Sequence, residues 1–475
     1  MTSFKETLLI AIFATACLLP AAGKAQDAHY WTLQYGTRST LLGGSVIGSV
    51  EDLGATYYNP ARLALTSDLS FLLSAKVYQW DKVIVEDGTD ARVDFRNSSF
   101  GGAPSLVAGT FKIGFLPGHH FAYSFLTRQR SELDLGIARG GIEDIIETIP
   151  GDELFATEIS LTQKIRDEWL GLSWAHRAGA KASFGITQFL SIRSQKSSFR
   201  RLSEALTTTN ETALAIQINE YNYETKGFLW KAGFALDLKY LSVGGTLTTP
   251  RLNLSGSGST LFNDAFGGAD LDGDGTRDDR LSARQEDDID AEYKSSWALG
   301  VGGALKLGRN KLHFSAEWYD AVKEFSIMEP ASFVSQSTGE TISRRLIQKL
   351  RAVLNYGIGL EVYLNEKVSG YGSFATDRSA APEDLGRIVN LTDTQTNAAT
   401  AVWDLYHVAG GGSVKAGRTE VTLGFTWSFA SQELPQTSDF FGPDTGTIRF
   451  ETQEVATTKL KFRRWKYIFG FSFEF

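Results

Sequence analysis

The residues best suited to chemistry form an acidic run in the middle of the chain. Residues 270–279 read DLDGDGTRDD, with carboxylates at relative positions 1, 3, 5 and 9 and Gly275 at position 6 for a sharp turn. Hard oxygen ligands at this spacing are typical of a calcium loop. Leu281 stands where the usual glutamate would be, so Asp279, Glu286 or Asp287 would have to close the site.

We therefore predict a structural Ca2+ site that braces the long segment between residues 252 and 292. The alternative is a solvated acidic loop, because charge runs are usually exposed to water. The predicted ligands are Asp270, Asp272, Asp274, Asp278 and Asp279.

The histidines offer no catalytic arrangement. An enzyme would need a nucleophile beside a base, or a metal triad. None of the 6 histidines lies in a recognisable catalytic motif, and His119-His120 falls in a tight turn where solvation is expected. We expect no enzyme activity, no catalytic residue, and no cofactor other than the predicted calcium ion.

The first residues have the character of an export signal. Lys5 precedes the apolar run LLIAIFATACLLPAAGKA, which has signal-peptide length and ends in small residues. We predict a signal peptide over 1–25, with a lipoprotein signal around Ala14 and Cys17 as the alternative. Cys17 is the one cysteine of the chain, so the mature protein should hold no disulfide.

The composition narrows the class of protein further. The net charge of −8 argues against nucleic-acid binding, which needs a concentrated basic surface. No later apolar run approaches the ~20 residues of a membrane helix. An exported, mildly acidic chain fits the envelope of a Gram-negative cell.

From about Leu69 onward the dominant pattern repeats every two residues. In residues 419–429 and at the C-terminus, one face of each expected strand is apolar and aromatic, and the other is small or polar. This pattern suits a lipid-facing exterior and a wet interior, with Phe475 as a typical barrel ending. A soluble all-β protein of lectin or adhesin type is the alternative. The apolar positions are Val421, Leu423, Phe425, Trp427, Phe429, Tyr467, Phe469, Phe471, Phe473 and Phe475.

Short and long connections alternate along this part of the chain. Their alternation predicts an all-β transmembrane antiparallel β-barrel of about 14 strands over residues 68–475, with periplasmic turns and extracellular loops. Within one loop, Gly141 to Leu154 has the spacing of a short amphipathic helix. The expected tight turns lie at 116–120, 177–181, 238–241, 308–311, 365–368 and 415–420, and the loops near 81–95, 132–155, 196–215, 252–292, 327–343, 377–400 and 431–450.

The segment before the first strand does not read as a strand. Pro60 lacks an N–H donor and restrains Asn59 from helical geometry, which makes the segment a poor place for ladder pairing. The stretch GSVIGSVEDLGATYYNPARLAL, with Gly48, Asp52, Ala55 and the run Tyr58 to Ala61, resembles the FadL/TodX family of outer-membrane transport proteins. Arg62 departs from that pattern, which more often has a small or apolar residue there.

The resemblance implies an N-terminal hatch, or plug, over residues 26–67 inside the barrel. It places Asn59 and Pro60 near the point where the hatch meets the first strand; a simple turn that starts the barrel is the alternative. The hatch and gating residues that it implies are Asp52, Tyr58, Asn59, Pro60 and Ala61.

The resemblance also implies a function. We expect a channel in the Gram-negative outer membrane for uptake of hydrophobic small molecules such as long-chain fatty acids or hydrocarbons. The alternative is a scaffold or shuttle of the same fold for secretion-system cargo or surface assembly. Besides the ligand, the expected partners are outer-membrane lipid and lipopolysaccharide, whose phosphates Arg200-Arg201 or Arg344-Arg345 could meet. Neither protein partners nor ligand-pocket residues follow from the sequence.

Overall fold

The structure is a computed structural model that describes most of the chain from residue 28 onward. The predicted signal peptide over 1–25, Cys17, Asp272 and Phe475 lie outside the described residues. The segments that it leaves out are 1–27, 66–68, 74–76, 87–94, 104, 145, 147–148, 271–273, 383–394, 399–402, 436–456 and 475.

Strands dominate the described chain. Eighteen of them form one large sheet in which every pairing is antiparallel, as expected for an all-β fold of this pattern. Two smaller sheets, β14-β17-β20 and β15-β16, lie outside it. The strands are β1 (Leu69–Leu73), β2 (Val77–Glu86), β3 (Phe95–Ala103), β4 (Leu106–Phe111), β5 (His119–Glu143), β6 (Glu153–Arg177), β7 (Ala182–Leu206), β8 (Thr212–Asp237), β9 (Leu241–Thr248), β10 (Leu252–Gly267), β11 (Arg280–Asp290), β12 (Ala298–Leu307), β13 (Asn310–Tyr319), β14 (Val322–Met328), β15 (Phe333–Val334), β16 (Thr341–Ile342), β17 (Arg345–Leu350), β18 (Val353–Tyr363), β19 (Val368–Asp377), β20 (Gln395–Asn397), β21 (Leu405–Ala416), β22 (Thr419–Pro435) and β23 (Thr457–Glu474).

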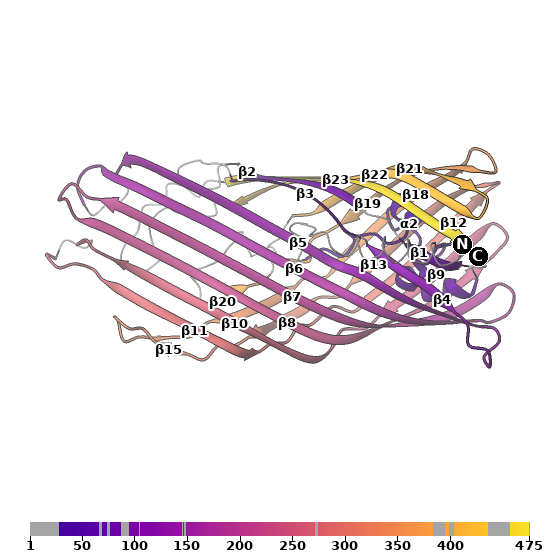
Figure 1. Ribbon diagram of the computed structural model, residues 1–475, viewed down its shortest axis with the longest axis horizontal. Helices are drawn as coiled ribbons and strands as arrows, with labels where there is room; N and C mark the ends of the chain where they lie inside the picture. The colour runs from indigo at the N-terminus through magenta and orange to yellow at the C-terminus, as the bar shows by residue number, and fades with distance from the viewer. Residues whose placement is uncertain are drawn as a thin grey trace, which may run out of the picture.

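Neighbours in the sequence are mostly neighbours in the sheet. β4 pairs with β5, and the pairing continues strand by strand through β6, β7 and β8. At the other end of the sequence, β23 pairs with β22 and also with β1 and β2. Hydrogen bonds therefore join the last strand of the chain to the first (Figure 1).

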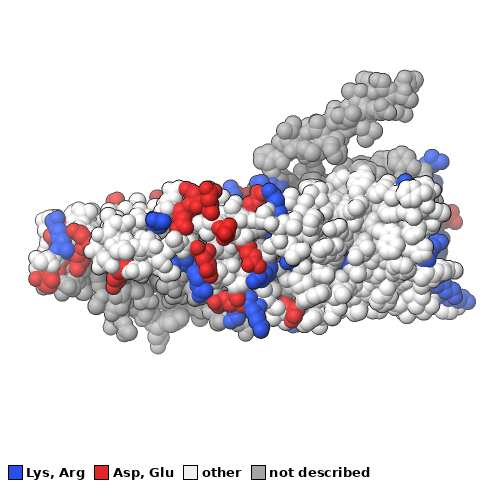
Figure 2. Space-filling model, turned by 90° about the horizontal axis from the view of Figure 1, so that it is seen from below, with Lys and Arg blue, Asp and Glu red and all other residues white. Residues whose placement is uncertain are grey.

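The two faces of the sheet differ as the two-residue period predicts. Along β6, buried and exposed residues alternate over most of its 25 residues, so one face points inward throughout. The outward face of its second half is apolar, with Leu170 44% and Leu172 56% exposed. Figure 2 shows a wide part of the outer surface without charged residues, next to a belt of mixed charge.

The structure confirms the predicted tight turns, but several of the predicted loops are largely strand. All six predicted tight turns fall between consecutive strands. The segments predicted as loops near 132–155, 196–215 and 252–292 are in large part strand, because β5 to β8 and the β10–β11 pair continue past the apolar stretch with polar outer faces. At ~3.3 Å per residue, 25-residue strands reach roughly 80 Å, far more than a bilayer core needs.

The predicted amphipathic helix over 141–154 is wrong. Residues 141–143 complete β5 and residues 153–154 begin β6, with Glu143 paired to Glu153. Ile146 and Ile149 are buried in an apolar cluster with Phe155, whereas Ile142 is 68% exposed. A short helix is marginal by itself, and at both ends of this segment strand pairing with a neighbour outweighs it.

Helices in the described chain are short and lie before the first strand. They are α2 (Thr37–Leu41), α3 (Ala55–Tyr58) and the 3-10 helix η1 (Pro60–Ala64). Within the described residues, none of the helices has the length and apolar character needed to cross a membrane.

Candidate functional site

Residues 28–65, which we call the N-terminal segment, are almost entirely buried. The segment lies against the inner face of the large sheet, between strands that are far apart in the sequence (Figure 1). It hydrogen-bonds to strands on several sides of it, among them β7, β8, β13, β18 and β19. Its small residues allow this close approach: a Cβ on Gly48 would lie 2.3 Å from the carbonyl oxygen of Gly302 in β12.

Asn59 and Pro60 connect this segment to the large sheet, which we call the wall. Asn59 is extended, at φ −162°, and its Oδ1 accepts a hydrogen bond from Ala61 N at 3.1 Å, which caps the 3-10 helix that Pro60 begins. Its Nδ2 donates to the carbonyl oxygens of Ile47 and of Phe234 in β8, both at 2.9 Å. One side chain thus holds together the helix start, the segment and the wall.

The contacts of this step differ from the expected ones. We expected Asn59 and Pro60 near the point where the hatch meets the first strand; within the described residues they contact β7 and β8. Ser183 of β7 donates to the carbonyl oxygen of Ala61 at 2.7 Å. Gly185 lies so close that a Cβ there would be 2.7 Å from the carbonyl carbon of Pro60. Only the folded sheet brings these strands to the Asn-Pro step.

Asp52 and Tyr58 hold the segment's own fold. Asp52 accepts hydrogen bonds from Gly54 N at 2.9 Å and from Ser39 Oγ at 3.3 Å. Burial raises the pKa of its carboxyl to about 6. Tyr58 donates to Gln34 Oε1 at 2.5 Å and accepts from the Tyr35 backbone N–H at 3.0 Å. Among the described residues neither side chain is hydrogen-bonded to the large sheet, unlike Asn59.

Arg62, which departs from the family pattern, is a wall contact. Its side chain is 4% exposed, and its Nη1 lies 2.8 Å from Asp237 Oδ1 at the end of β8. Its Nε donates to the carbonyl oxygen of Val50 at 3.2 Å. The departure therefore adds an ion pair between the segment and the sheet.

A second ionic anchor, which sequence reasoning missed, lies on another side of the segment. Arg38 donates from Nε and Nη2 to the two oxygens of Glu361 in β18, at 2.9 and 2.6 Å. Lys311 of β13 donates to both oxygens of Glu51, at 2.7 and 3.0 Å. His313 lies between them, 2.8 Å from Ser49 Oγ and 3.3 Å from Glu361 Oε2.

The charges of this second anchor balance. Burial acts to raise the pKa of Glu51, but Arg38 and Lys311 beside it hold that pKa below its ordinary value. Two cations thus face two carboxylates. An arginine in a segment of small residues was a signal that could have indicated such a pair, but nothing in the sequence identifies a partner 323 residues away.

The first residues of the segment have an anchor of their own. Asp377, at the end of β19, accepts from the backbone N–H groups of Tyr30 and Trp31, at 3.0 and 2.9 Å, and from the Thr32 hydroxyl. His407 of β21 lies 3.6 Å from the same carboxylate. The segment is therefore fastened along its length by groups that belong to the wall.

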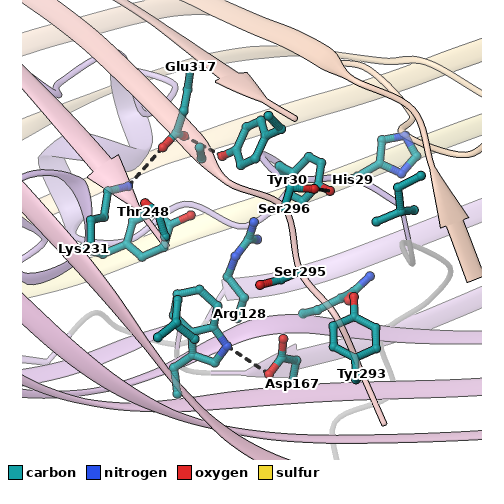
Figure 3. A pocket seen from close by; sticks show the side chains of 17 residues that line it. His29, Tyr30, Arg128, Asp167, Lys231, Thr248, Tyr293, Ser295, Ser296 and Glu317 are labelled. Carbon is teal, nitrogen blue, oxygen red and sulfur yellow. Dashed lines mark hydrogen bonds and ion pairs between the residues drawn. The ribbon is translucent and has the colours of Figure 1, made fainter. Parts of the chain in front are cut away.

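A pocket lies beside the segment, and residues of both the segment and the wall line it (Figure 3). The polar part of its lining includes an ion pair between Lys231 of β8 and Glu317 of β13, with Nζ and Oε1 3.1 Å apart. Trp31 of the segment donates its indole N–H to Glu317 at 2.9 Å. We call this the aromatic pocket; its lining is His29, Tyr30, Tyr57, Arg128, Gln129, Asp167, Trp169, Leu229, Lys231, Thr248, Tyr293, Ser295, Ser296, Ala298, Glu317, Tyr319 and Leu350.

The acidic run keeps its carboxylates occupied with turn hydrogen bonds. Asp270 accepts from Gly275 N at 2.7 Å, Asp274 from Thr276 N at 2.7 Å, and Asp279 from Gly268 N at 3.0 Å. Across the described residues, no group of three or more His, Cys, Asp or Glu is placed to hold a metal ion. Because Asp272 lies outside them, the calcium site stays a prediction.

The architecture is that of FadL-type outer-membrane transporters. No protein-family model and no curated protein matches the chain. Among solved structures, the P. putida toluene transporter TodX matches with a TM-score of 0.61 at 12% identity, over 93% of this chain and 99% of its own. A Pseudomonas aeruginosa FadL homologue matches with 0.55 at 12%, over 94% and 100%. The Ralstonia pickettii toluene transporter TbuX matches with 0.50 at 11%, over 93% and 98%.

Proposed function

We propose that this protein is a channel in the Gram-negative outer membrane that admits hydrophobic small molecules, and that the N-terminal segment is its hatch. The observation that carries the proposal is the aromatic pocket directly against a buried, wall-anchored segment. Two of the similar structures are toluene transporters. Those similar structures also favour a transport role over an enzymatic one.

We further propose that the large sheet closes into a barrel of about 14 strands that spans the membrane. Several of its eighteen strands are consecutive pieces that share one partner: β1 and β2 both pair with β23, and β9 and β10 both pair with β8. The pairings of β23 with β1 and β22 support closure, since closure leaves no unpaired strand edge in lipid. The apolar outer face supports the membrane position. Exposed aromatic and leucine side chains such as Phe234, Leu423 and Tyr467, at 57%, 56% and 59%, are costly in water and favourable in lipid.

Gating by the hatch rests on how the segment is held. An apolar cluster packs it against the sheet, and polar contacts at Arg38, Asn59 and Arg62 fix it in addition. The polar contacts can be exchanged for contacts with water, so part of the segment can shift while the apolar cluster stays packed. A hatch of this type can shift while the barrel wall keeps its strand pairing.

Uptake measurements test the function. Cells that carry the gene should accumulate labelled toluene or oleate faster than cells that lack it. A variant deleted for residues 30–60 should in addition admit a hydrophilic solute such as arabinose, which the intact chain excludes. Equal uptake of toluene and oleate by all strains would count against transport.

We also propose that the acidic run binds calcium and braces the strands on either side of it. The hairpin of β10 and β11, which flanks the run, supports a structural role. Calorimetric titration of the purified protein with Ca2+ should give binding heat. The single variants Asp272→Ala and Asp274→Ala should each lose that heat. Heat that is equal in the intact chain and in both variants would end this proposal.

A further inference from the structure

Arg128 places a guanidinium in the middle of the aromatic pocket (Figure 3). It lies at a bulge in β5: the register with β6 shifts between Thr127 and Gln129, and both of these neighbours are buried. A bulge adds one residue to a strand and changes which alternate positions face inward. The buried positions are 122, 124 and 126 before the bulge and 129, 131 and 133 after it, so Arg128 and Gln129, although adjacent in the sequence, both reach the pocket.

The partners of this guanidinium are aromatic rings. Its central carbon lies 5.8 Å from the ring centre of Tyr30, 5.9 Å from that of Tyr57 and 5.7 Å from that of Trp169. Within the described chain, Arg128 has no carboxylate at ion-pair distance. Cation–π contacts recover only part of the hydration that a buried cation loses.

The carboxylates of the pocket are committed elsewhere. Glu317 pairs with Lys231 and also accepts from Tyr319 and Trp31. Asp167 accepts from the indole N–H of Trp169 at 2.9 Å and from Ser191 Oγ at 2.8 Å.

Two further arginines lie beside one residue of the pocket lining. Arg193 and Arg251 lie over the ring of Tyr293, at 4.2 and 5.7 Å, and neither has an ion pair in the described chain. The lining itself holds two cations, Arg128 and Lys231, and two carboxylates, but Lys231 is the cation that is ion-paired, so Arg128 is left without a carboxylate partner.

We propose that the pocket binds an aromatic carboxylate, with the carboxylate on Arg128 and the ligand ring among the tyrosines. This inference rests on the proposed transport function and names its substrate class. A guanidinium offers two parallel N–H donors to a carboxylate, and a bound carboxylate would be the ion-pair partner that Arg128 lacks in the pocket. Flat rings favour offset stacking on other rings. The stacked rings of Tyr30 and Tyr319, whose centres are 3.8 Å apart, offer an aromatic surface for the ligand ring.

A second pocket nearer the long strand ends repeats the same combination. Arg344 lies 3.8 Å from the ring centre of Phe262, and its Nη1 is buried with no hydrogen-bond partner in the described chain. Burial lowers the pKa of Arg344 to about 10, so it stays a cation at neutral pH. Tyr221 and Phe333 complete the apolar lining. The second pocket therefore also places a guanidinium over an aromatic ring.

Binding of benzoate and of toluene separates this proposal from a plain hydrocarbon site. The two probes share a ring and differ mainly in one negative charge. Isothermal titration of the full chain in detergent at neutral pH should show benzoate binding at least tenfold tighter than toluene. Arg128→Met, which keeps side-chain length, should weaken benzoate about ten- to hundredfold and leave toluene within twofold. Arg130→Met, on the outward face of the same strand, is the matched control.

The outcomes are distinct. Toluene bound as tightly as benzoate, or benzoate binding unchanged by Arg128→Met, would overturn the assignment of a carboxylate ligand while the transport function stands. Octanoate bound more tightly than benzoate would overturn its aromatic part. A chain that binds neither ring probe and raises uptake of neither toluene nor oleate would refute the transport function as well.

Discussion

A disulfide between Leu42→Cys and Gly359→Cys should stop uptake, and reduction should restore it. Leu42 belongs to the N-terminal segment and Gly359 to β18 of the wall. A Cβ on residue 359 would lie 3.3 Å from the Cβ of Leu42, close to the ~3.5–4.5 Å that a disulfide spans. The bond would fix the hatch to the wall. Cys17 lies in the predicted signal peptide, so we expect no third thiol in the mature chain.

The measurement is uptake of labelled toluene with oxidant and then with dithiothreitol. Oxidised cells should fall to the level of cells without the gene, and reduced cells should recover to at least half of the unmodified rate. Each single cysteine variant serves as the control and should respond to neither reagent. If the oxidised double variant transports at the rate of the reduced one, the hatch does not move during passage, and the proposed gating is wrong.

Glu361→Gln should loosen the hatch while the wall stays folded. It leaves the Arg38 guanidinium, 11% exposed, without its bidentate partner and with only Glu51 at 3.6 Å. Removing one partner of a buried pair costs about 3–5 kcal/mol, so the local opening of the hatch should become roughly a hundredfold or more frequent. Hydrogen exchange of the peptide over residues 37–51 should quicken by that factor.

Glu366→Gln is the matched control, because it removes the same charge from an exposed residue in the turn after β18. It should leave hatch exchange unchanged. The double variant with Arg38→Met and Glu361→Leu should regain much of the protection, since an apolar pair avoids the unpaired charge. Unchanged exchange in Glu361→Gln would show that this ion pair does not hold the hatch.

Much of the fold follows from local signals. The alternation in residues 419–429 predicts a strand with Leu423 outside and Thr422 inside, and these residues are 56% and 1% exposed. The tight turns at 308–311 and 365–368 follow from short polar breaks in that alternation. Each of these features depends on residues within a few positions of one another, which is why the sequence alone predicts them.

The segment with Asn59 and Pro60 was predictable only in part. That this step interrupts strand pairing follows from proline chemistry, and η1 does begin there. Its contacts with β7 and β8 could not be predicted, because Asn59 and Phe234 are 175 residues apart. The residues next to Asn59 in the sequence do not indicate which strands of the sheet the N-terminal segment will contact.

The sequence by itself determined the two-residue period, the turns and the irregular start of this protein, because these depend on local backbone preference and side-chain alternation. Three features depend on the tertiary structure alone. Arg38 pairs with Glu361, several expected loops continue as strands, and Arg128 reaches the pocket at a bulge in β5. Such features depend on sheet register and on pairs brought together from distant parts of the chain, and neither has a local sequence signature.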